Sequence, residues 1–366
     1  MENSTSNKQH FSNTLINWYH QNKRNLPWRN TTSAYHIWLS EIILQQTRVS
    51  QGLPYYQQFT EKFPTIQDLA NAQEDEVMRT WQGLGYYSRA RNLHKCAKII
   101  TENFLGKFPE SYKELLKLPG IGPYTGAAIA SFAFKEPVPA IDGNAYRVLS
   151  RVFGLDHDLS ESKTFRKFFE ASGQLIPDNN PDDYNQAIME FGAMHCTPKN
   201  PNCQECPFIS SCFAYENNQQ HLLPVKTKKT KVSKRHMNYL VFRHADTFFM
   251  KQRSGKDIWQ GLYDFYCLES ENNPDINEIE DKLLFSLLNS GAIVEHESTV
   301  YKHVLSHRQL FIRFYVIDVQ SSANVQMLEQ SDLIAFEKET LEEIPKPIII
   351  DKFLKIYNGE QNLLIL

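Results

Sequence analysis

The spacing of hydrophobic residues changes once along this chain, near residue 236. Before that point, apolar residues recur every three or four positions, which is typical of helices packed by one face. Helices are predicted at 11–19, 35–49, 65–82, 89–105, 111–117, after Pro123, after Asp142 and twice within 161–194. Beyond it, β-branched and aromatic residues predict strands at 237–244, 247–253, 261–268 and 308–319, and helices at 275–290 and 341–357. The pattern predicts a multidomain chain, mostly α-helical first and α+β afterwards.

The domain boundaries follow from the same change of pattern. We expect a helical domain at 1–215, a linker at 216–235 and an α+β domain at 236–366. The linker is polar and then strongly basic, with uncompensated charges at Lys226, Lys228, Lys229, Lys231, Lys234 and Arg235. Such charge runs are usually solvated connections, so we expect this one to join two domains first and to touch phosphate second.

One stretch of the helical half, 115–155, reads as helix, glycine turn, helix, and then an aspartate before another helix. Pro119 ends the first helix, because the residue before a proline disfavours helical geometry. Gly120 and Gly122 give the turn backbone angles that are closed to other residues, and Pro123 suits a first helical position. Bare N–H groups at such a helix start form an anion site. The pattern predicts a helix-hairpin-helix that holds a DNA phosphate without reading sequence.

Asp142 stands immediately before the next helical pattern. An aspartate at this place is usually a helix cap, whose carboxylate accepts backbone N–H bonds. Hydrogen bonds of that kind favour the charged form, so we expect the pKa of Asp142 to be lowered. Capping is compatible with a second role, because an ionised carboxylate stabilises a developing cation.

Glu41 lies on the apolar stripe of its predicted helix, with Ile37 one turn before it and Leu44 one turn after it. Burial disfavours the charge of a carboxylate and raises its pKa, which suits a general acid. The alternative is a structural ion pair with Arg29 or Arg48, and the helix alone does not decide between the two.

Four of the six cysteines lie within seventeen residues, at Cys196, Cys203, Cys206 and Cys212. Clustered cysteines without histidine at ligand spacing indicate a metal site in the loop 196–212 rather than disulfides. Tetrahedral zinc and a [4Fe–4S] cluster are both compatible with this spacing.

Net charge and hydropathy narrow the class of protein. The net charge of -3 is unevenly distributed: up to Arg235 there are 27 Lys and Arg against 22 Asp and Glu, and afterwards 12 against 20. The basic half contains the hairpin, which agrees with a phosphate-binding face. A mean hydropathy of -0.47, no apolar run of membrane length and no secretory signal predict a cytoplasmic protein, and we expect a monomer with no membrane partner.

Several segments occur together in one order: LPWR, WLSEIILQQTRV, GLGYYSRARN, LPGIGPYT, AIDGNAYRVLSR and the cysteine loop. In this combination the chain closely resembles the MutY family of adenine DNA glycosylases, in the helix-hairpin-helix superfamily that includes endonuclease III. The resemblance implies hydrolytic removal of adenine mispaired with 8-oxoguanine or guanine in double-stranded DNA, leaving an abasic site. It also implies a [4Fe–4S] cluster on the four cysteines. Relatives with lyase activity have a Schiff-base lysine where this chain has Tyr124, so a monofunctional enzyme is expected.

The resemblance also assigns roles to single residues. Glu41 would protonate the flipped-out adenine, and ionised Asp142 would stabilise the oxocarbenium-like sugar. Tyr124 and Asn144 match positions that support this site. The remaining matches are Trp28, Arg29 and Gln186 in the base pocket, and Gln46, Thr47, Leu84, Tyr86, Ser306 and His307 beside the duplex and the lesion. Taken alone, the glycine-rich segment around Tyr86 is more often a capped helix end than a base-stacking surface.

The C-terminal half resembles the family's MutT-like domain, which has a Nudix fold and helps to recognise 8-oxoguanine. The glutamate-rich Nudix catalytic box does not follow Gly261, so we expect no pyrophosphohydrolase activity. Ser306 and His307 match a Phe-Ser-His lesion-sensing loop, with Leu305 in place of phenylalanine. Without the resemblance, this pair is an ordinary turn at a strand end.

Two other functions remain open at this stage. One is a glycosylase of the same fold with another mismatch specificity, such as thymine opposite guanine. The other is a non-catalytic DNA-damage binder with a redox cluster, although such a binder has no need of both Glu41 and Asp142.

Overall fold

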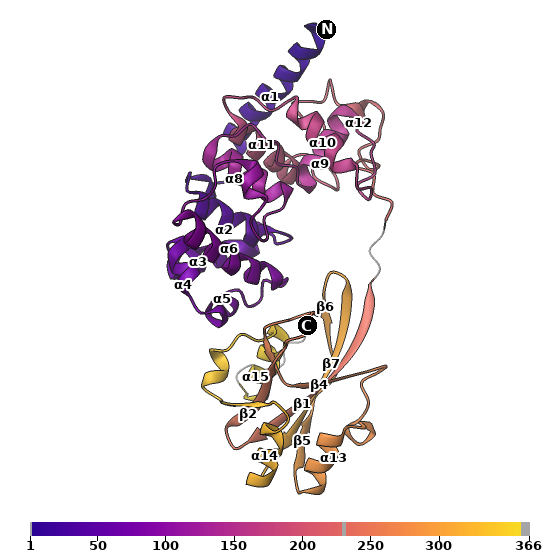
Figure 1. Cartoon of the computed structure of the whole chain (residues 1–366). Coiled ribbons are helices and arrows are strands. Elements are labelled where there is room, and N and C mark those ends of the chain that lie inside the picture. The colour runs from indigo at the N-terminus through magenta and orange to yellow at the C-terminus, as the bar shows by residue number, and fades with distance from the viewer. Residues whose placement is uncertain (1, 229–231, 360–366) are drawn as a thin grey trace. The chain divides into compact units, whose positions relative to one another are not determined.

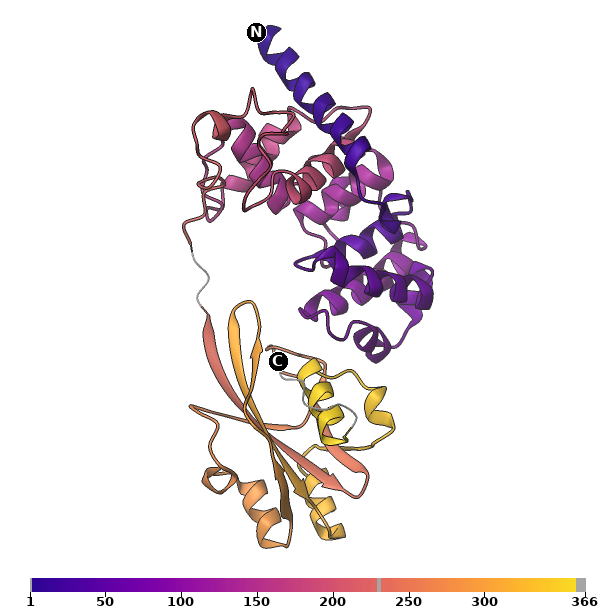
Figure 2. The same cartoon turned by 180° about the vertical axis from the view of Figure 1, so that it is seen from behind.

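The computed structural model describes residues 2–228 and 232–359, with side chains from residue 9 onward. The chain divides into two compact units, Met1–Asn71 with Asn92–Lys229, and Ala72–Arg91 with Thr230–Leu366. Lys229 and Lys231, two cations of the expected linker, lie outside the described residues. No helix in the described part of the chain combines the length and the apolarity that a membrane crossing requires. Figures 1 and 2 show the ribbon of the chain from opposite sides.

The first unit is helical, as the hydrophobic spacing predicted (Figure 1). Its elements are α1 (Glu2–Asn22), η1 (Pro27–Arg29), α2 (Ala34–Leu44), α3 (Val49–Lys62), α4 (Ile66–Asn71), α6 (Ser88–Phe104, whose first turn belongs to the second unit), α7 (Tyr112–Leu115), α8 (Pro123–Phe134), α9 (Gly143–Phe153), α10 (Thr164–Gly173), α11 (Pro181–Met194) and α12 (Phe213–Glu216). One core joins α1, α9, α10 and α11 through fully buried side chains such as Leu15, Leu149, Phe168 and Ile188. This core fixes the start of α9 and the pocket-facing side of α11, which carry candidate site residues.

Four expected helices are interrupted: 275–290 and 341–357 each divide into a 3-10 helix and a shorter α-helix, and the two breaks nearer the N-terminus are as follows. The segment 35–49 is not one helix: α2 ends at Leu44, Gln46 takes a left-handed backbone conformation at φ +54°, and α3 begins at Val49. The segment 65–82 likewise divides into α4 and α5 (Glu74–Thr80). Apolar residues continue at helical spacing across both breaks, so the pattern did not reveal the turns. The helix α3 was not predicted.

The second unit is built on a sheet (orange in Figure 1) with helices α5, α13 (Lys282–Asn289), α14 (Ser322–Glu329) and α15 (Ile348–Tyr357). Short 3-10 helices occur at η2 (Ile276–Glu278) and η3 (Thr340–Glu342). The strands are β1 (Ser233–His244), β2 (Thr247–Gln252), β3 (Tyr263–Asp264), β4 (Tyr266–Ser270), β5 (Ile293–Glu297), β6 (Tyr301–Val304), β7 (Arg308–Asp318) and β8 (Ile334–Glu337). Their order is β3-β2-β1-β7-β5, with β4 beside β1, β6 beside β7 and β8 beside β2.

Helices cover both faces of this sheet. Strands β1 and β7 pair in parallel along their whole length, and parallel strands are normally buried on both sides. Leu240 and Phe242 point to the face where Leu284 of α13 and Leu328 of α14 pack. On the other face Phe314 stacks on Phe353 of α15, with ring centroids 4.0 Å apart. The expected α+β fold is therefore confirmed, and β1 begins at Ser233, inside the segment predicted as a linker.

Candidate active site

The helical unit contains a cleft of about 1110 Å³ between η1, the end of α2, the hairpin turn, the start of α9 and α11. Ligand pockets are commonly ~300–1,000 Å³, so this cleft has room for an extruded nucleotide. It brings together eleven of the residues singled out in the sequence: Trp28, Arg29, Glu41, Gln46, Thr47, Gly120, Gly122, Tyr124, Asp142, Asn144 and Gln186. Residues 84, 86, 306 and 307 belong to the other unit.

Glu41 is buried on a helix that has no exposed face around it. Every residue from Ile37 to Ile43 in α2 is buried, and Glu41 itself is 8% exposed. Removal from water raises the pKa of Glu41 to about 7, and the negative charge of Asp142 adds to the rise, while a Tyr124 hydrogen bond and Arg29 oppose it. The expected burial is confirmed, and a substantial fraction of this carboxyl group is protonated near neutral pH.

Asp142 caps α9, as the sequence predicted. Its Oδ1 atom accepts hydrogen bonds from the backbone N–H of Asn144 at 2.9 Å and of Ala145 at 2.7 Å, and its Oδ2 atom accepts one from the Asn144 amide at 2.6 Å. The expectation of a lowered pKa is wrong. Burial raises the pKa of Asp142, and it outweighs the three hydrogen bonds and the charge of Arg147. The capping role alone did not predict the direction of this pKa shift, because the loss of water around the carboxylate depends on the whole cleft.

Tyr124 lines the same cleft as the two carboxylates and interacts with both of them. It is the second residue of α8, and its hydroxyl contacts the Met189 sulfur at 3.2 Å. Burial and the charges of Glu41 and Asp142 raise its pKa well above the usual value, so its phenol stays protonated. A neutral hydroxyl is a hydrogen-bond donor to either carboxylate, whereas an amine at this place would have been a nucleophile.

Arg147 was missed by the sequence reasoning. It is buried in α9, one turn after Gly143, and its guanidinium donates to the Asn144 side chain at 2.7 Å. The same group donates to the carbonyl oxygens of Cys196 at 2.7 Å and Gly192 at 2.6 Å. One side chain therefore connects the Asp142 cap to the cysteine loop. The available signal was an arginine between apolar helix positions, which is costly unless it is paired.

The wall of the cleft near Gln186 is held by an ion-pair cluster, also missed. Glu190 of α11 accepts hydrogen bonds from Arg29 at 2.8 and 2.7 Å and from Arg24 at 2.8 Å. Burial alone would raise the pKa of Glu190, but the two arginines hold it at about 2. The Tyr19 hydroxyl donates to Oε1 of Gln186 at 2.9 Å, which turns the amide nitrogen toward other partners.

The glycine turn has the geometry that the sequence suggested. Gly120 is left-handed, with φ +78°, and a Cβ atom there would lie 2.9 Å from the Asn92 Cβ atom. Gly122 caps α8 with φ -91°, is exposed, and has open space where a Cβ atom would project. The first glycine is therefore required by the fold, whereas the second leaves the helix start open to an approaching anion.

The four clustered cysteines carry free thiols and lie close enough to influence one another. Burial raises the pKa of Cys206 to about 12, and the charges of Cys196, Cys212 and Cys203 add to the rise. Among the described residues, however, no three His, Cys, Asp or Glu side chains converge on a single metal position. Four cysteine thiolates are the ligand set of structural zinc and also of a [4Fe–4S] cluster, so the type and number of these side chains fit either group.

The candidate lesion-side residues belong to the second unit. The Tyr86 hydroxyl donates a hydrogen bond to the Ser306 hydroxyl, so the structure brings these two together. Tyr86 is 41% exposed in a left-handed conformation, and Ser306 and His307 are exposed at the turn between β6 and β7. Leu84, expected to enter the duplex, is buried in this structure.

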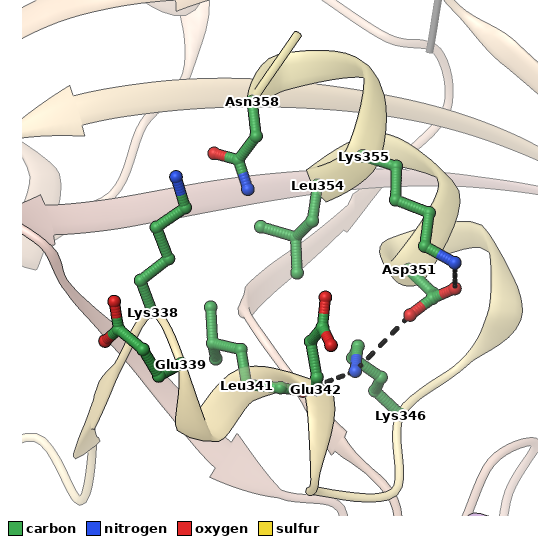
Figure 3. A pocket seen from close by; sticks show the side chains of 9 residues that line it. All are labelled: Lys338, Glu339, Leu341, Glu342, Lys346, Asp351, Leu354, Lys355 and Asn358. Atoms are coloured by element: carbon green, nitrogen blue, oxygen red, sulfur yellow. Dashed lines mark hydrogen bonds and ion pairs between the residues drawn. The ribbon is translucent and has the colours of Figure 1, made fainter. Parts of the chain in front are cut away.

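Figure 3 shows another pocket of the second unit, lined by lysines and acids from the segment 338–346 and from α15. Asp351 pairs with Lys346 at 3.4 Å and with Lys355 at 3.1 Å. Burial lowers the pKa of Lys346 to about 8, although Asp351 opposes the change. These charges compensate one another, so the pocket has the character of a structural ion-pair cluster.

Family models match both units. Residues 39–172 match the HhH-GPD superfamily base excision DNA repair proteins, and residues 238–355 match the NUDIX domain. Among curated relatives, the chain is 34% identical over 348 residues to an adenine DNA glycosylase of Buchnera aphidicola subsp. Schizaphis graminum, covering 95% of this chain and 98% of that one. It is 42% identical over 222 residues to a human adenine DNA glycosylase, covering 58% of this chain and 41% of that one.

Solved structures resemble the helical part. A thermostable thymine-DNA glycosylase aligns with a TM-score of 0.55 and 28% identity, over 58% of this chain and 99% of that one. A trapped endonuclease III–DNA covalent intermediate aligns with a TM-score of 0.50 and 22% identity, over 58% of this chain and 98% of that one. The second likeness concerns the fold alone.

Proposed function

The chain belongs to the adenine DNA glycosylase family, and we propose that its substrate is adenine mispaired with 8-oxoguanine or guanine in duplex DNA. It is a base excision repair enzyme that cleaves the N-glycosidic bond of adenine in DNA. The single observation that supports the proposed chemistry best is the pair of carboxyl groups, Glu41 and Asp142, on one cleft of nucleotide size. Burial raises the pKa of Glu41 to about 7, which suits a proton donor, and three hydrogen bonds to Asp142 oppose the rise that burial causes in its pKa.

The reaction we propose begins with extrusion of adenine from the duplex, because its glycosidic bond is inaccessible inside the base stack. Glu41, whose pKa is about 7, donates a proton to the adenine ring. The C1′–N9 bond then breaks, its electron pair leaves with the neutral base, and positive charge develops on the sugar. Asp142, held by three hydrogen bonds, stabilises that charge until water adds to C1′.

Other residues of the cleft bind and orient the base. The Gln186 amide both donates to and accepts from an adenine edge, and its contact with Tyr19 favours one orientation. Trp28 is a large apolar wall and Arg29 is held by Glu190. Asn144 and Tyr124 support the carboxylates. The hairpin at Gly120–Gly122 would hold a phosphate beside the extruded nucleotide.

We propose that Cys196, Cys203, Cys206 and Cys212 hold a [4Fe–4S] cluster. Support comes from four free cysteines grouped in one loop, three of which, Cys196, Cys206 and Cys212, pack against the helical core, and from the family to which the chain belongs. A bound cluster would cross-link the four cysteines of its loop. Because the Arg147 guanidinium donates to both the Cys196 carbonyl and the Asn144 side chain, a fixed loop would also help to fix Asn144, which contacts Asp142. This is a structural role, and no step of base removal passes through the cluster.

We propose that four residues of the second unit contact the lesion or the adjoining duplex: Leu84, Tyr86, Ser306 and His307. Gln46 and Thr47 of the helical unit would contact the duplex as well. Ser306 and His307 stand exposed on a turn, and Gln46 is exposed in the turn after α2. We further propose that the enzyme acts as a monomer, and that in a bacterial cell it works in the cytoplasm, where the DNA lies.

A single-turnover assay on duplexes that differ in one pair tests the substrate. We expect base release from A:8-oxoG first, then from A:G, and none from A:T. Thymine opposite guanine is the informative competitor, because the thymine-DNA glycosylase has a similar helical fold. Release of thymine from T:G without release of adenine from A:8-oxoG would refute the proposal.

A further inference from the structure

The turn that carries Ser306 and His307 is short and has a defined base. The Leu305 N–H donates to the Arg308 carbonyl at 2.8 Å and the Arg308 N–H to the Leu305 carbonyl at 3.4 Å, so two residues connect β6 to β7. The His307 carbonyl accepts the Ser233 N–H of β1 at 3.0 Å. The conformation of the turn therefore depends on where Arg308 is held.

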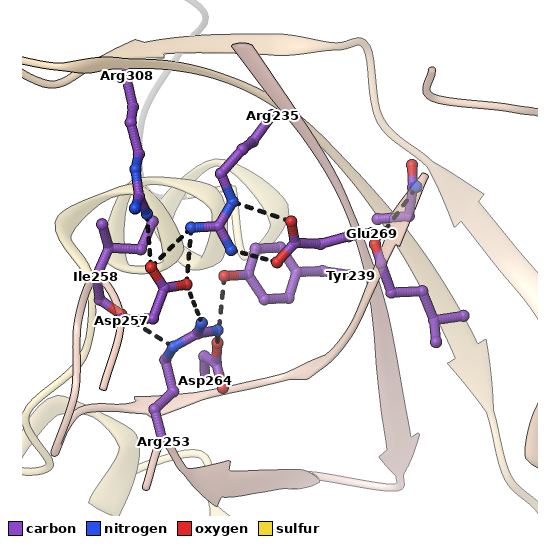
Figure 4. A network of polar contacts seen from close by, with 10 residues as sticks. Arg235, Tyr239, Arg253, Asp257, Ile258, Asp264, Glu269 and Arg308 are labelled. Carbon is purple, nitrogen blue, oxygen red and sulfur yellow. Dashed lines mark hydrogen bonds and ion pairs between the residues drawn. The ribbon is translucent and has the colours of Figure 1, made fainter. Parts of the chain in front are cut away.

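Arg308 is held by a carboxylate from a different part of the sheet. In the loop between β2 and β3, Asp257 accepts a hydrogen bond from the Arg308 guanidinium at 2.5 Å. The same carboxylate pairs with Arg235 of β1 at 2.7 Å and with Arg253 at 3.4 Å. Figure 4 shows Asp257 between these three guanidinium groups.

The network around Asp257 compensates its charges. Arg235 also pairs with Glu269, and Arg253 pairs with Asp264 at 2.6 Å, which accepts a hydrogen bond from the Tyr239 hydroxyl (Figure 4). Burial alone would raise the pKa of Asp257, but the hydrogen bonds from Arg308, the Ile258 backbone and Arg235 hold it at about 2. Asp257 is thus a permanent anion with one contact to the base of the turn.

A second contact joins the same loop to the same hairpin. The Trp259 ring lies 6.0 Å, centroid to centroid, from the His303 ring of β6. Trp259 is buried in a left-handed conformation, with φ +61°, two residues after Asp257. The loop therefore supports both strands of the hairpin, β6 through an aromatic contact and β7 through an ion pair.

We propose that Asp257 is a positioning residue for lesion recognition: through Arg308 it fixes the Ser306–His307 turn in the form that meets 8-oxoguanine. The inference rests on the proposed function and adds to it a residue outside the resemblance to the family. Asp257 itself touches neither base nor sugar. Without its carboxylate, Arg308 loses this ion pair, and the turn keeps only the contacts of Ser233 with His307 and of Tyr86 with Ser306.

The test compares single-turnover adenine release from A:8-oxoG and A:G duplexes in the full-length protein. Asp257→Asn is expected to reduce the A:8-oxoG over A:G rate ratio about tenfold, because Arg308 loses a hydrogen bond to a charged acceptor, while the A:G rate stays unchanged. Asp257→Glu should restore much of the ratio. The matched control is Glu269→Gln, which loosens Arg235 in the same network without touching the hairpin and should keep the ratio.

The variant Arg308→Gln distinguishes an effect on the position of the Ser306–His307 turn from an effect of net charge on DNA binding. It lowers the net charge by one, whereas Asp257→Asn raises it by one, so their effects on affinity for undamaged duplex should be opposite. Both should nevertheless reduce the rate ratio, and the double variant should reduce it no further. A wild-type ratio in both single variants would overturn the inference. If the wild-type protein itself releases no adenine, the proposed function fails instead, and the two failures are distinguishable.

Discussion

Glu41 and Asp142 line one cleft, but the groups that surround their carboxyl groups differ. Asp142 receives three N–H hydrogen bonds at the start of α9, while Glu41 sits in an apolar helix with the Tyr124 hydroxyl as a neighbour. The charge of Asp142 raises the pKa of Glu41. The hydrogen bonds to Asp142 favour its charged form against the effect of burial, whereas burial favours the protonated form of Glu41, and two-carboxylate glycosidic cleavage uses this division of roles.

Glu41→Gln tests the environment of this residue independently of catalysis. The pKa of Glu41 is about 7 in the folded protein against 4.5 ordinarily, so folding becomes less favourable as pH rises between those values. Glutamine does not ionise, so the variant should be more stable than wild type above pH 7, by about 3 kcal/mol at most. Thermal melts from pH 4 to 8 should show the Tm difference growing through this window. A difference independent of pH would contradict the assigned environment.

The positions of the two carboxylates in the fold were easier to predict from the sequence than the directions of their pKa shifts. The burial of Glu41 and the capping by Asp142 follow from helical spacing and from a local turn signal, and both were predicted. The direction of the pKa shift of Asp142 was not predicted, because burial depends on the whole cleft and not on the local cap. Arg147 and Glu190 were missed for the same reason: their partners lie on other elements, 49 and 161 positions away respectively for Cys196 and Arg29.

The two glycines of the hairpin before α8 have different roles: one permits the turn, and the other leaves the start of the helix accessible. Gly120 is needed for the turn itself, because its left-handed backbone and the neighbouring Asn92 leave no room for a side chain. Gly122 has ordinary backbone angles and faces open space. A Cβ atom there disturbs nothing in the protein, but it stands where a phosphate would approach the N–H groups of α8.

Gly120→Ala should therefore affect stability, whereas Gly122→Ala should affect DNA binding. We expect Gly120→Ala to lower the free energy of unfolding by about 1–2 kcal/mol through its positive φ. Gly122→Ala should leave stability unchanged and weaken binding of undamaged duplex. Chemical denaturation and a duplex-binding titration measure the two effects. Full duplex affinity in Gly122→Ala would remove this turn from the phosphate site.

Element types were predictable from the chain, and element boundaries were less so. The 3.6-residue spacing identified α6 and α9, and strand composition identified β1, β2 and β7. The break after Leu44 was lost because Val49 continues the apolar spacing after the turn. A left-handed Gln46 leaves no signature in a hydrophobic pattern, since its conformation depends on how α2 and α3 pack.

For the molecule as a whole, the change of hydrophobic pattern predicted two parts, but it did not reveal that residues 72–91 group with the C-terminal one. Residues 72–91 group with the C-terminal sheet, through contacts such as Arg91 to the Gln260 carbonyl at 2.5 Å and the Lys346 N–H to Gln82 at 3.2 Å. These contacts join segments more than 160 residues apart, and such long-range pairs carry no periodic signal. Composition did indicate that charge is divided between a basic first part and an acidic second part.

The cluster proposal is tested on the whole protein. We expect about four iron atoms per chain and a yellow-brown colour. Cys206→Ser should lose iron and destabilise the helical unit, whereas Cys267→Ser, a lone cysteine of β4, should retain it. Metal analysis after purification without added metal gives the answer. A colourless protein with one zinc ion per chain would contradict the assignment.

The central claim is that Glu41 and Asp142 act on the same extruded adenine. Single-turnover release of adenine from an A:8-oxoG duplex, with enzyme in excess, tests it most directly in the wild type, Glu41→Gln and Asp142→Asn. We predict that both variants bind the duplex as the wild type does and that each loses base release about a hundredfold or more. Wild-type release in either variant would contradict the account.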